Sequence, residues 1–421
     1  MSIKNAVLAA GIALAATLAS LSANAGTPGW SNDQVKGSIT FYSQRTDLID
    51  QGAFDRWIKL FKQKYPGVDD VKVEGLTDYL GQIQPRMQTK DYGDVVLILA
   101  SIPRDQYSYF FLPLDDLGLE GELYFEDLWA YQGKPYGYSQ GVSAEGLVYN
   151  KKAFEKAGVK APLNTLDELH DAAKKLKAAG IVPLSINMGA GWPMAQWDKL
   201  AALYAGDYGY FNSMIDDPSP YDADKPYGKA IQFVKTFFDN GWTEADYVSN
   251  NWEASKGHMA RGDYAMWFFG NWSIPQIGTE NPNWKEEIGF MPLPIDNSGQ
   301  PKALLSNDWA YGVSAFSKNP ITAKAWVRFL LVETDYAEVA GYMPTAKNQS
   351  SSIPQLAEIM SYDPDIIEVK PTSMEFTKAG NKARIDFFGG KYIRDLLLAD
   401  DFDNAISKLN KRWQKAIHRL K

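Results

Sequence analysis

The sequence has no cysteine and only three histidines, His170, His258 and His418. Without cysteine the chain forms no disulfide framework and no zinc-thiolate site. The isolated histidines have no second ligand at helical spacing, and the HExxH, GxSxG and Walker motifs are all missing. We therefore expect no metal ion, no cofactor and no catalytic residue, and we do not expect an enzyme.

Long hydrophobic runs are also missing, except at the start of the chain. Residues 1–25 contain one charge, Lys4, then an apolar run, then the small residues Ala23-Asn24-Ala25. This order is typical of a secretory signal peptide that is cleaved before Gly26. Because that junction has no cysteine for a lipid anchor, we predict a periplasmic protein that is free of the membrane.

The chain also has no excess of basic over acidic residues. After the leader is removed, 42 Lys and Arg face 51 Asp and Glu, a net charge of −9. Nucleic-acid phosphates require a basic patch, so we expect no nucleic-acid partner. About 396 residues remain, enough for two or three domains with their own cores.

Predicted strands and helices alternate along the chain. Strands are expected at residues 38–43, 71–73, 94–99, 264–269 and 311–316, and helices near 54–61, 79–89, 167–179, 193–205, 226–240, 353–361 and 401–419. The βαβαβ order of the first half predicts an α/β fold with a mostly parallel sheet covered by helices. Trp57 and Trp326 fall at core positions of two helices.

The most informative stretch is residues 146–184. Thr165 and Glu168 have the spacing of a capping box, in which each side chain bonds the backbone of the other residue. Apolar residues then recur at i, i+3, i+4 and i+7 from Leu169, and Gly180 ends the helix before Pro183. The segment predicts a strand followed by a well-capped amphipathic helix.

The order of these pieces resembles bacterial extracellular sugar-binding proteins, the maltose-binding-like solute receptors of ABC importers. The resemblance rests on Tyr149-Asn150-Lys151 and the segment after it, on Gly270-Asn271-Trp272, and on Gly341-Tyr342-Met343-Pro344. Further matching pieces are residues 61–67, 113–116, 262–266, 291–294 and 317–320. Residues 307–309 differ from the glycine-rich sequence that many relatives have there.

The resemblance implies a two-lobe periplasmic-binding-protein fold (Venus-flytrap). Each lobe would be a mostly parallel sheet flanked by helices, with the ligand cleft at the hinge. We expect lobe 1 at 36–141 plus 289–335, lobe 2 at 142–288 plus 336–421, and residues 1–25 as the leader. The implied partners are an oligosaccharide and the membrane permease of an ABC importer, and we expect a monomer.

Three tryptophans lie in loops where rings could stack on the C–H face of a sugar. Trp272 matches the family's tryptophan in a glycine-bounded turn, and Trp309 with Asp308 precedes a strand in a loop that usually reaches the ligand in relatives. Trp192 lies in a glycine-lined turn after a strand, which is a typical position for a crevice site. We predict that these residues bind ligand.

Polar candidates complete the predicted site. Gln44, Arg45 and Asp47 follow the first strand, Glu145 borders the first crossing between lobes, and Tyr342 lies in the Gly-Tyr-Met-Pro turn. Arg384 would suit a sugar that carries a carboxylate, because its guanidinium bonds both carboxylate oxygens.

Two other classes stay open at this point. The same fold could bind a polyamine, a phosphodiester or a peptide. A secreted carbohydrate-active enzyme is the minor alternative, although the adjacent acid pairs do not face each other as glycosidase carboxylates must.

Overall fold

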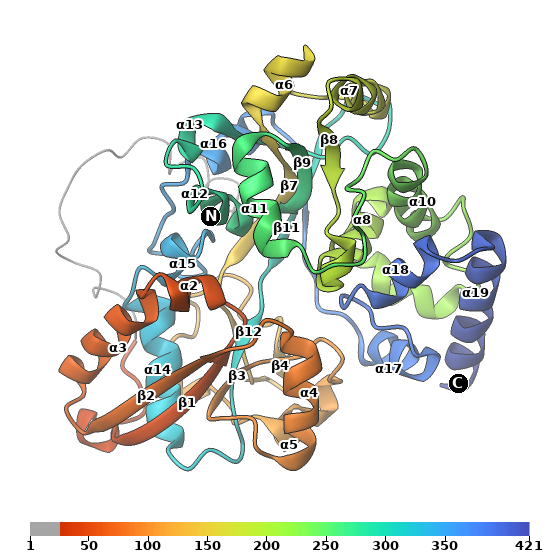
Figure 1. Cartoon of the computed structure of the whole chain (residues 1–421). Helices are drawn as coiled ribbons and strands as arrows, with labels where there is room; N and C mark the ends of the chain where they lie inside the picture. The colour runs from red at the N-terminus through yellow and green to blue at the C-terminus, as the bar shows by residue number, and fades with distance from the viewer. Residues whose placement is uncertain (1–25, 421) are drawn as a thin grey trace. The chain divides into compact units, whose positions relative to one another are not determined.

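In the computed structural model, which describes residues 26–420, the chain divides into two units (Figure 1). Among the described residues, unit 1 contains 143–306 and 353–420, and unit 2 contains 26–142 and 307–352. The chain therefore passes from one unit to the other three times.

Unit 2 is built on a five-stranded sheet in the order β2-β1-β3-β12-β6. Its strands are β1 (Gly37–Ser43), β2 (Val68–Gly75), β3 (Val95–Leu97), β6 (Tyr138–Ser139) and β12 (Ala310–Val313), and β4 (Ala130–Tyr131) pairs separately with β5 (Lys134–Pro135). Its helices are α2 (Thr46–Asp50), α3 (Ala53–Lys64), α4 (Tyr79–Thr89), α5 (Tyr107–Phe110), α14 (Pro320–Val332) and α15 (Tyr336–Val339). β1, β2 and β3 are parallel, and β12 runs antiparallel to β3 and β6.

The core of unit 2 is largely aromatic. Helix α3 packs on β2 and helix α14 on β1 (Figure 1). Trp57 and Trp326 are fully buried, as their spacing predicts. Phe61 lies edge-on to Trp326 with the ring centres 5.1 Å apart, so the rings of α3 and α14 interlock.

Unit 1 is built on a six-stranded sheet in the order β13-β11-β7-β9-β8, with β10 paired to β7. Its strands are β7 (Val142–Asn150), β8 (Val182–Ser185), β9 (Tyr264–Gly270), β10 (Ile288–Met291), β11 (Lys302–Asn307) and β13 (Asp365–Glu368). Its helices are α6 (Lys151–Ala157), α7 (Leu166–Ala178), α8 (Gln196–Ala205), α9 (Tyr210–Ser213), α10 (Pro226–Asp239), α11 (Trp252–Arg261), α12 (Ile274–Gly278), α13 (Trp284–Glu287), α16 (Pro354–Ser361), α17 (Met374–Ala383), α18 (Lys391–Leu397) and α19 (Phe402–His418).

The capping box of α7 is confirmed. The Thr165 hydroxyl accepts a hydrogen bond from the backbone N–H of Glu168 at 3.2 Å, and the Glu168 carboxylate accepts one from the N–H of Thr165 at 3.3 Å. Leu169, Ala172, Ala173 and Leu176 are the buried residues of this helix. The sequence pattern thus determined both where α7 begins and which face it buries.

The α/β fold with two sheet-containing units is confirmed, but three expectations are wrong. The sheets of both units are mixed rather than mostly parallel, because β12 runs antiparallel to β3 and β6 in unit 2 and β7 runs antiparallel to β9 and β10 in unit 1. The chain does not change unit after residue 288, since β10 pairs with β7 and residues 289–306 stay in unit 1. It also does not change unit after 335, because the Tyr336 ring packs 5.3 Å from Trp57 in unit 2.

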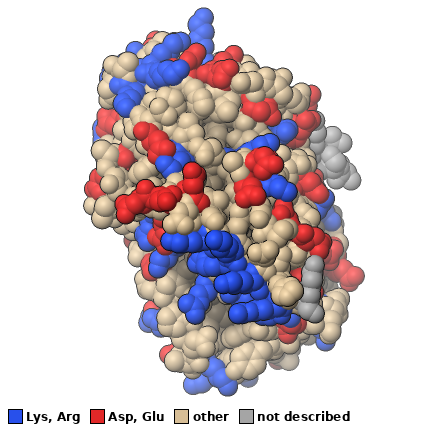
Figure 2. Space-filling model, turned by 90° about the vertical axis from the view of Figure 1, so that its right-hand side faces the viewer, with Lys and Arg blue, Asp and Glu red and all other residues tan. Residues whose placement is uncertain are grey.

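Charged side chains of opposite sign gather in different areas of the surface. Figure 2 shows a continuous band of Lys and Arg on one face, with Asp and Glu grouped beside it. Of residues 26–420, no helix is both long and apolar enough to cross a membrane. The predicted signal peptide, residues 1–25, lies outside the described residues.

Candidate ligand-binding site

In unit 2, the predicted polar residues come together at one edge of the sheet. β1 and β3 are parallel, β12 runs antiparallel to β3, and β6 runs antiparallel to β12. The carboxyl ends of β1, β3 and β6 therefore meet the start of β12. Gln44, Arg45 and Asp47 follow β1, Gln140 follows β6, and Asp308 and Trp309 precede β12.

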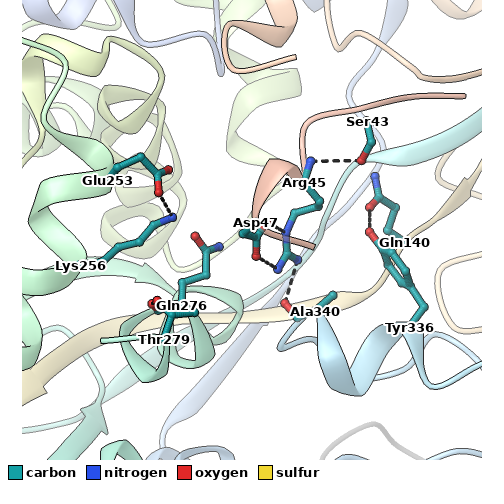
Figure 3. Close-up of polar contacts among 10 residues, drawn as sticks. All are labelled: Ser43, Arg45, Asp47, Gln140, Glu253, Lys256, Gln276, Thr279, Tyr336 and Ala340. Carbon is teal, nitrogen blue, oxygen red and sulfur yellow. Dashed lines mark hydrogen bonds and ion pairs between the residues drawn. The ribbon is translucent and has the colours of Figure 1, made fainter. Parts of the chain in front are cut away.

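Arg45 is a buried anchor at this edge. Its Nε and Nη2 atoms donate to the two carboxylate oxygens of Asp47 at 2.8 and 2.6 Å, and Nη1 donates to the carbonyl oxygen of Ala340 at 2.8 Å (Figure 3). Its guanidinium lies 5.5 Å from the centre of the Tyr342 ring. Burial alone would lower the pKa of Arg45, but the Asp47 carboxylate raises it above its ordinary value. Arg45 is therefore ionised, and the Asp47 carboxylate balances its positive charge.

Two tyrosines continue this network. Tyr342 is buried and its ring packs on Tyr336 with the centres 6.5 Å apart. The Tyr336 hydroxyl donates to the Oε1 oxygen of Gln140 (Figure 3). Tyr342, which the sequence predicted as a ligand-binding residue, is therefore buried in this network and packs against Tyr336 and Arg45.

Two amide side chains at this edge have unused atoms. The Nε2 atom of Gln140 and the Oε1 atom of Gln44 are buried, and neither has a hydrogen-bond partner among residues 26–420. A buried donor or acceptor without a partner costs about 1–3 kcal/mol. Such a pair, one donor and one acceptor, is suited to a ligand rich in hydroxyl groups.

The Trp309 ring is half-buried and held from one side. The Tyr79 ring packs against it at 63° with the centres 5.3 Å apart, and the Tyr79 hydroxyl accepts from the N–H of Leu97 at 2.7 Å. The Oδ1 oxygen of Asp308 accepts from the N–H of Trp309 at 2.7 Å. This loop therefore presents an indole ring in a fixed orientation.

Unit 1 has a comparable sheet edge. β8 and β9 are parallel, and β7 runs antiparallel to β9, with Glu145 paired to Gly270. The carboxyl ends of β8 and β9 therefore meet the start of β7. Trp192 follows β8, Trp272 follows β9, and Ser143 and Glu145 lie on the first residues of β7.

The rings of this edge form one cluster. The Trp192 ring lies 4.9 Å from Trp252, 5.8 Å from Phe269 and 5.9 Å from Trp272. Trp272 and Trp252 are buried to 9% exposure, whereas Trp192 is half-buried. Trp192 thus offers a ring surface, and Trp272 mainly supports it.

Glu145 is a buried carboxylate at the same edge. Its Oε1 oxygen accepts from the Lys199 ammonium at 2.6 Å and from the Ser306 hydroxyl at 2.8 Å. Its Oε2 oxygen and the Ser143 hydroxyl are buried without a partner among the described residues. A Cβ atom at Gly270 would lie 1.9 Å from that hydroxyl, so only glycine allows this approach.

Several residues of these edges had no local sequence signal. Lys256 is nearly buried, with its ammonium 2.7 Å from the Glu253 carboxylate and 5.5 Å from the centre of the Trp252 ring. Gln276 is buried on α12, the helix that packs on α11 (Figure 3). Tyr79, Gln140 and Trp252 were also not predicted as residues of the site, because each lies in a segment whose sequence is typical of a protein core.

Arg384 does not belong to either group. It is exposed, in a left-handed conformation (φ 55°) at the end of α17, and the contacts of the described residues do not connect it to a sheet edge. No cluster of His, Cys, Asp or Glu in residues 26–420 could hold a metal ion.

Comparison with known proteins defines the class. The family model of the bacterial extracellular solute-binding proteins matches residues 45–336, which is more than half of the chain. The protein therefore belongs to this family, and its predicted class is confirmed.

Particular relatives are similar over most of the chain. An uncharacterized ABC transporter extracellular-binding protein of Pyrococcus horikoshii is 21% identical over 312 residues, which cover 70% of this chain and 69% of its own. A manno-oligosaccharide specific solute-binding protein of Bifidobacterium animalis subsp. lactis, solved with mannotriose, is 25% identical with a TM-score of 0.83 and coverage of 93% and 97%. A second binding protein of that organism, solved with mannobiose, is 27% identical with a TM-score of 0.83 and the same coverage.

Proposed function

We propose that this protein binds a neutral oligosaccharide in the periplasm and delivers it, chemically unchanged, to the permease of an ABC importer. It acts as a monomer after removal of residues 1–25, and it has no nucleic-acid partner. The similarity to a manno-oligosaccharide specific solute-binding protein solved with mannotriose, and to a binding protein of an ABC transporter solved with mannobiose, supports this proposal and makes mannotriose the first ligand to test. In unit 1 we assign ligand contacts to Trp192 and the unused polar atoms of its sheet edge, and in unit 2, separately, to Trp309 and the unused polar atoms of its own edge.

The observation that carries the choice of a neutral ligand is that Arg45, Lys199 and Lys256, the cations at the two edges, are each paired with a carboxylate. Arg45 is neutralised by Asp47, Lys199 by Glu145, and Lys256 by Glu253. A polyamine requires carboxylates that are not already paired with a base, and a phosphodiester requires free cationic groups. Rings together with unused amide, hydroxyl and carboxylate atoms fit a ligand that is polar but uncharged.

A thermal-shift screen tests the proposal. Mannotriose and other neutral oligosaccharides, uronate-bearing oligosaccharides, spermidine and a glycerophosphodiester are each added to the full mature chain. A ligand that binds only the native state raises the melting temperature, by an amount that grows with its concentration above Kd. We expect a rise with a neutral oligosaccharide. A rise only with spermidine or the phosphodiester would contradict the proposal, and consumption of the sugar over hours would indicate an enzyme.

A further inference from the structure

The last helix carries a stripe of basic side chains. These are Lys408, Lys411, Arg412, Lys415 and Arg419, and all five are exposed. Their spacing places them on one face of α19, since residues three and four apart are neighbours on a helix. The buried residues of α19, which include Leu409 and Trp413, form the opposite face. Figure 2 views the side of the molecule on which α17 and α19 lie in Figure 1, and it shows a continuous band of Lys and Arg.

This stripe is exceptional in an acidic chain. From Asn404 to Lys421 there are six Lys and Arg and no Asp or Glu, whereas the other residues carry 37 Lys and Arg against 51 Asp and Glu. Helix α17 packs on α19, and the Lys382 ammonium donates to the carbonyl oxygen of Arg419 at 3.0 Å. Lys382 therefore adds a further base at the end of the stripe.

The five basic side chains of the stripe have no ion-pair partner in the part of the chain that the structure describes. Elsewhere on the surface of unit 1, Lys235 pairs with Asp239 and Lys370 with Asp207. None of the five stripe side chains forms an ion pair with a residue in 26–420. A helix dipole favours cations only in the last turn, so it accounts for Lys415 and Arg419 but not for the bases from 408 to 412.

We propose that this stripe docks the protein weakly and reversibly on an anionic phospholipid surface. The stripe covers eleven residue steps, about 16 Å of helix, which can meet a flat surface along its whole length. Each base near an anionic bilayer increases the partition coefficient by about fivefold. Because salt screens distant charges more than near ones, the side chains of the stripe, which lie nearest the bilayer in this orientation, dominate the interaction.

The composition of the stripe favours lipid headgroups over nucleic acid. The exposed large hydrophobic side chains of residues 26–420 all lie outside α19, so the stripe has no exposed Trp, Tyr or Phe ring on which a base could stack. The chain has no cysteine that could carry a thioether lipid. A purely electrostatic surface would keep an extracellular receptor close to a membrane without anchoring it. This inference does not depend on the identity of the sugar.

Vesicle sedimentation tests the inference. The full mature chain is mixed with phosphatidylcholine vesicles containing about 30 mol % phosphatidylglycerol, or none, at about 30 mM and about 500 mM salt. We expect binding only to the anionic vesicles at low salt. The variant K411E/R412E/K415E reverses the centre of the stripe, and we expect its partition coefficient to fall by at least tenfold.

The matched control is K59E/K160E/K175E, which changes the net charge equally at three exposed and scattered positions. We expect this control to bind within about threefold of the unchanged protein, because the cluster determines binding rather than the net charge. An equal loss in both variants, no binding by the unchanged protein, or equal binding to both kinds of vesicle would each overturn the inference. Circular dichroism and urea denaturation show whether both variants are folded, and calorimetry with the sugar tests the proposed function separately.

Discussion

The ammonium of Lys199 lies 2.6 Å from the Oε1 oxygen of Glu145, whose side chain is completely buried. Lys199 belongs to α8 and Glu145 to β7, so the ion pair fixes a helix to the central strand of unit 1. The pair leaves one carboxylate oxygen without a partner among the described residues, at the edge where the ring of Trp192 is presented. Under the proposed function, the carboxylate that this ion pair stabilises is also one that offers an oxygen to the ligand.

Removal of the Lys199 ammonium should destabilise the protein strongly. In Lys199→Met the Glu145 carboxylate stays buried without its cation, which costs about 3–5 kcal/mol. Urea denaturation followed by circular dichroism measures the change in the free energy of unfolding. The double variant Lys199→Met/Glu145→Gln should recover much of the lost stability.

Lys235→Met is the matched control, because its i,i+4 pair with a half-exposed Asp239 should contribute less than about 1 kcal/mol. Equal stability of Lys199→Met and Lys235→Met would refute this role.

The half-buried rings should determine sugar affinity. Trp192→Ala and Trp309→Ala each lose a stacking surface worth roughly 1–3 kcal/mol, so we expect the Kd for the sugar to rise by about fivefold to about 150-fold. Isothermal titration calorimetry measures this. The control is Trp284→Ala, another half-buried ring, on the α13 helix that leads into β10 and the other end of β7. Unchanged affinity in both edge variants would show that these rings are not part of the site.

Trp272 should behave differently from Trp192. Its ring is almost covered by Phe269, Trp252 and Trp192, so Trp272→Ala creates a cavity and should cost about 3–5 kcal/mol of stability. Trp272→Phe should keep most of the packing and most of the affinity. Melting temperature and Kd, measured together, separate the two effects. A Trp272→Ala variant with normal stability and lost affinity would place this ring in direct contact with the sugar.

Asp198 should make the stability depend on pH. Burial raises its pKa to about 7, against the lowering effect of hydrogen bonds from Tyr227, Tyr392 and the backbone N–H of Phe388. Between about pH 4 and pH 7 the native state keeps a proton that the unfolded chain has released. The stability contribution is therefore complete below about pH 4 and is lost as the pH rises through 7, by up to about 1.4 kcal/mol per pH unit.

The measurement is the difference in unfolding free energy between the unchanged protein and Asp198→Asn, from pH 4 to pH 8. We expect the advantage of the unchanged protein to be largest at low pH and to shrink toward pH 8. A difference that does not vary with pH would mean that Asp198 is ionised throughout in the native state.

The start of α7 should lose stability when its cap is removed. Thr165→Ala removes the acceptor for the N–H of Glu168 and should cost about 1 kcal/mol of unfolding free energy. Thr165→Ser keeps the hydroxyl and should be nearly neutral. Urea midpoints measured at constant m-value compare the two. If alanine and serine were equivalent, the capping box would contribute nothing.

Features that depend on neighbouring residues could be predicted from the sequence. The ends and buried face of α7, strand β1 and the buried positions of Trp57 and Trp326 follow from local spacing. The place of Gln44, Arg45 and Asp47 at a sheet edge also followed, because they come directly after a strand, whereas the place of Trp309 was expected from the family resemblance.

Features that depend on pairing across long stretches of chain could not be predicted. Glu145 and Lys199 are 54 residues apart, and nothing in either segment identifies the other. The antiparallel pairing of β7 with β9 makes the sheet of unit 1 mixed, and the pairing of β7 with β10 keeps the residues after 288 in unit 1. Hydrophobic pattern alone gives neither the direction nor the partner of a strand. Lys256 and Gln276 look like ordinary helix residues until α11 and α12 pack.

Calorimetric titration of the full mature chain with mannotriose and related neutral oligosaccharides, at low and at high salt, tests the central claim most directly. Because Arg45, Lys199 and Lys256 at the two edges are already paired with carboxylates, we predict that a neutral oligosaccharide binds with a stoichiometry of one, with a Kd that does not change with salt and a ligand recovered intact. A Kd that weakens steeply with salt, binding restricted to charged ligands, or a degraded sugar would contradict the account.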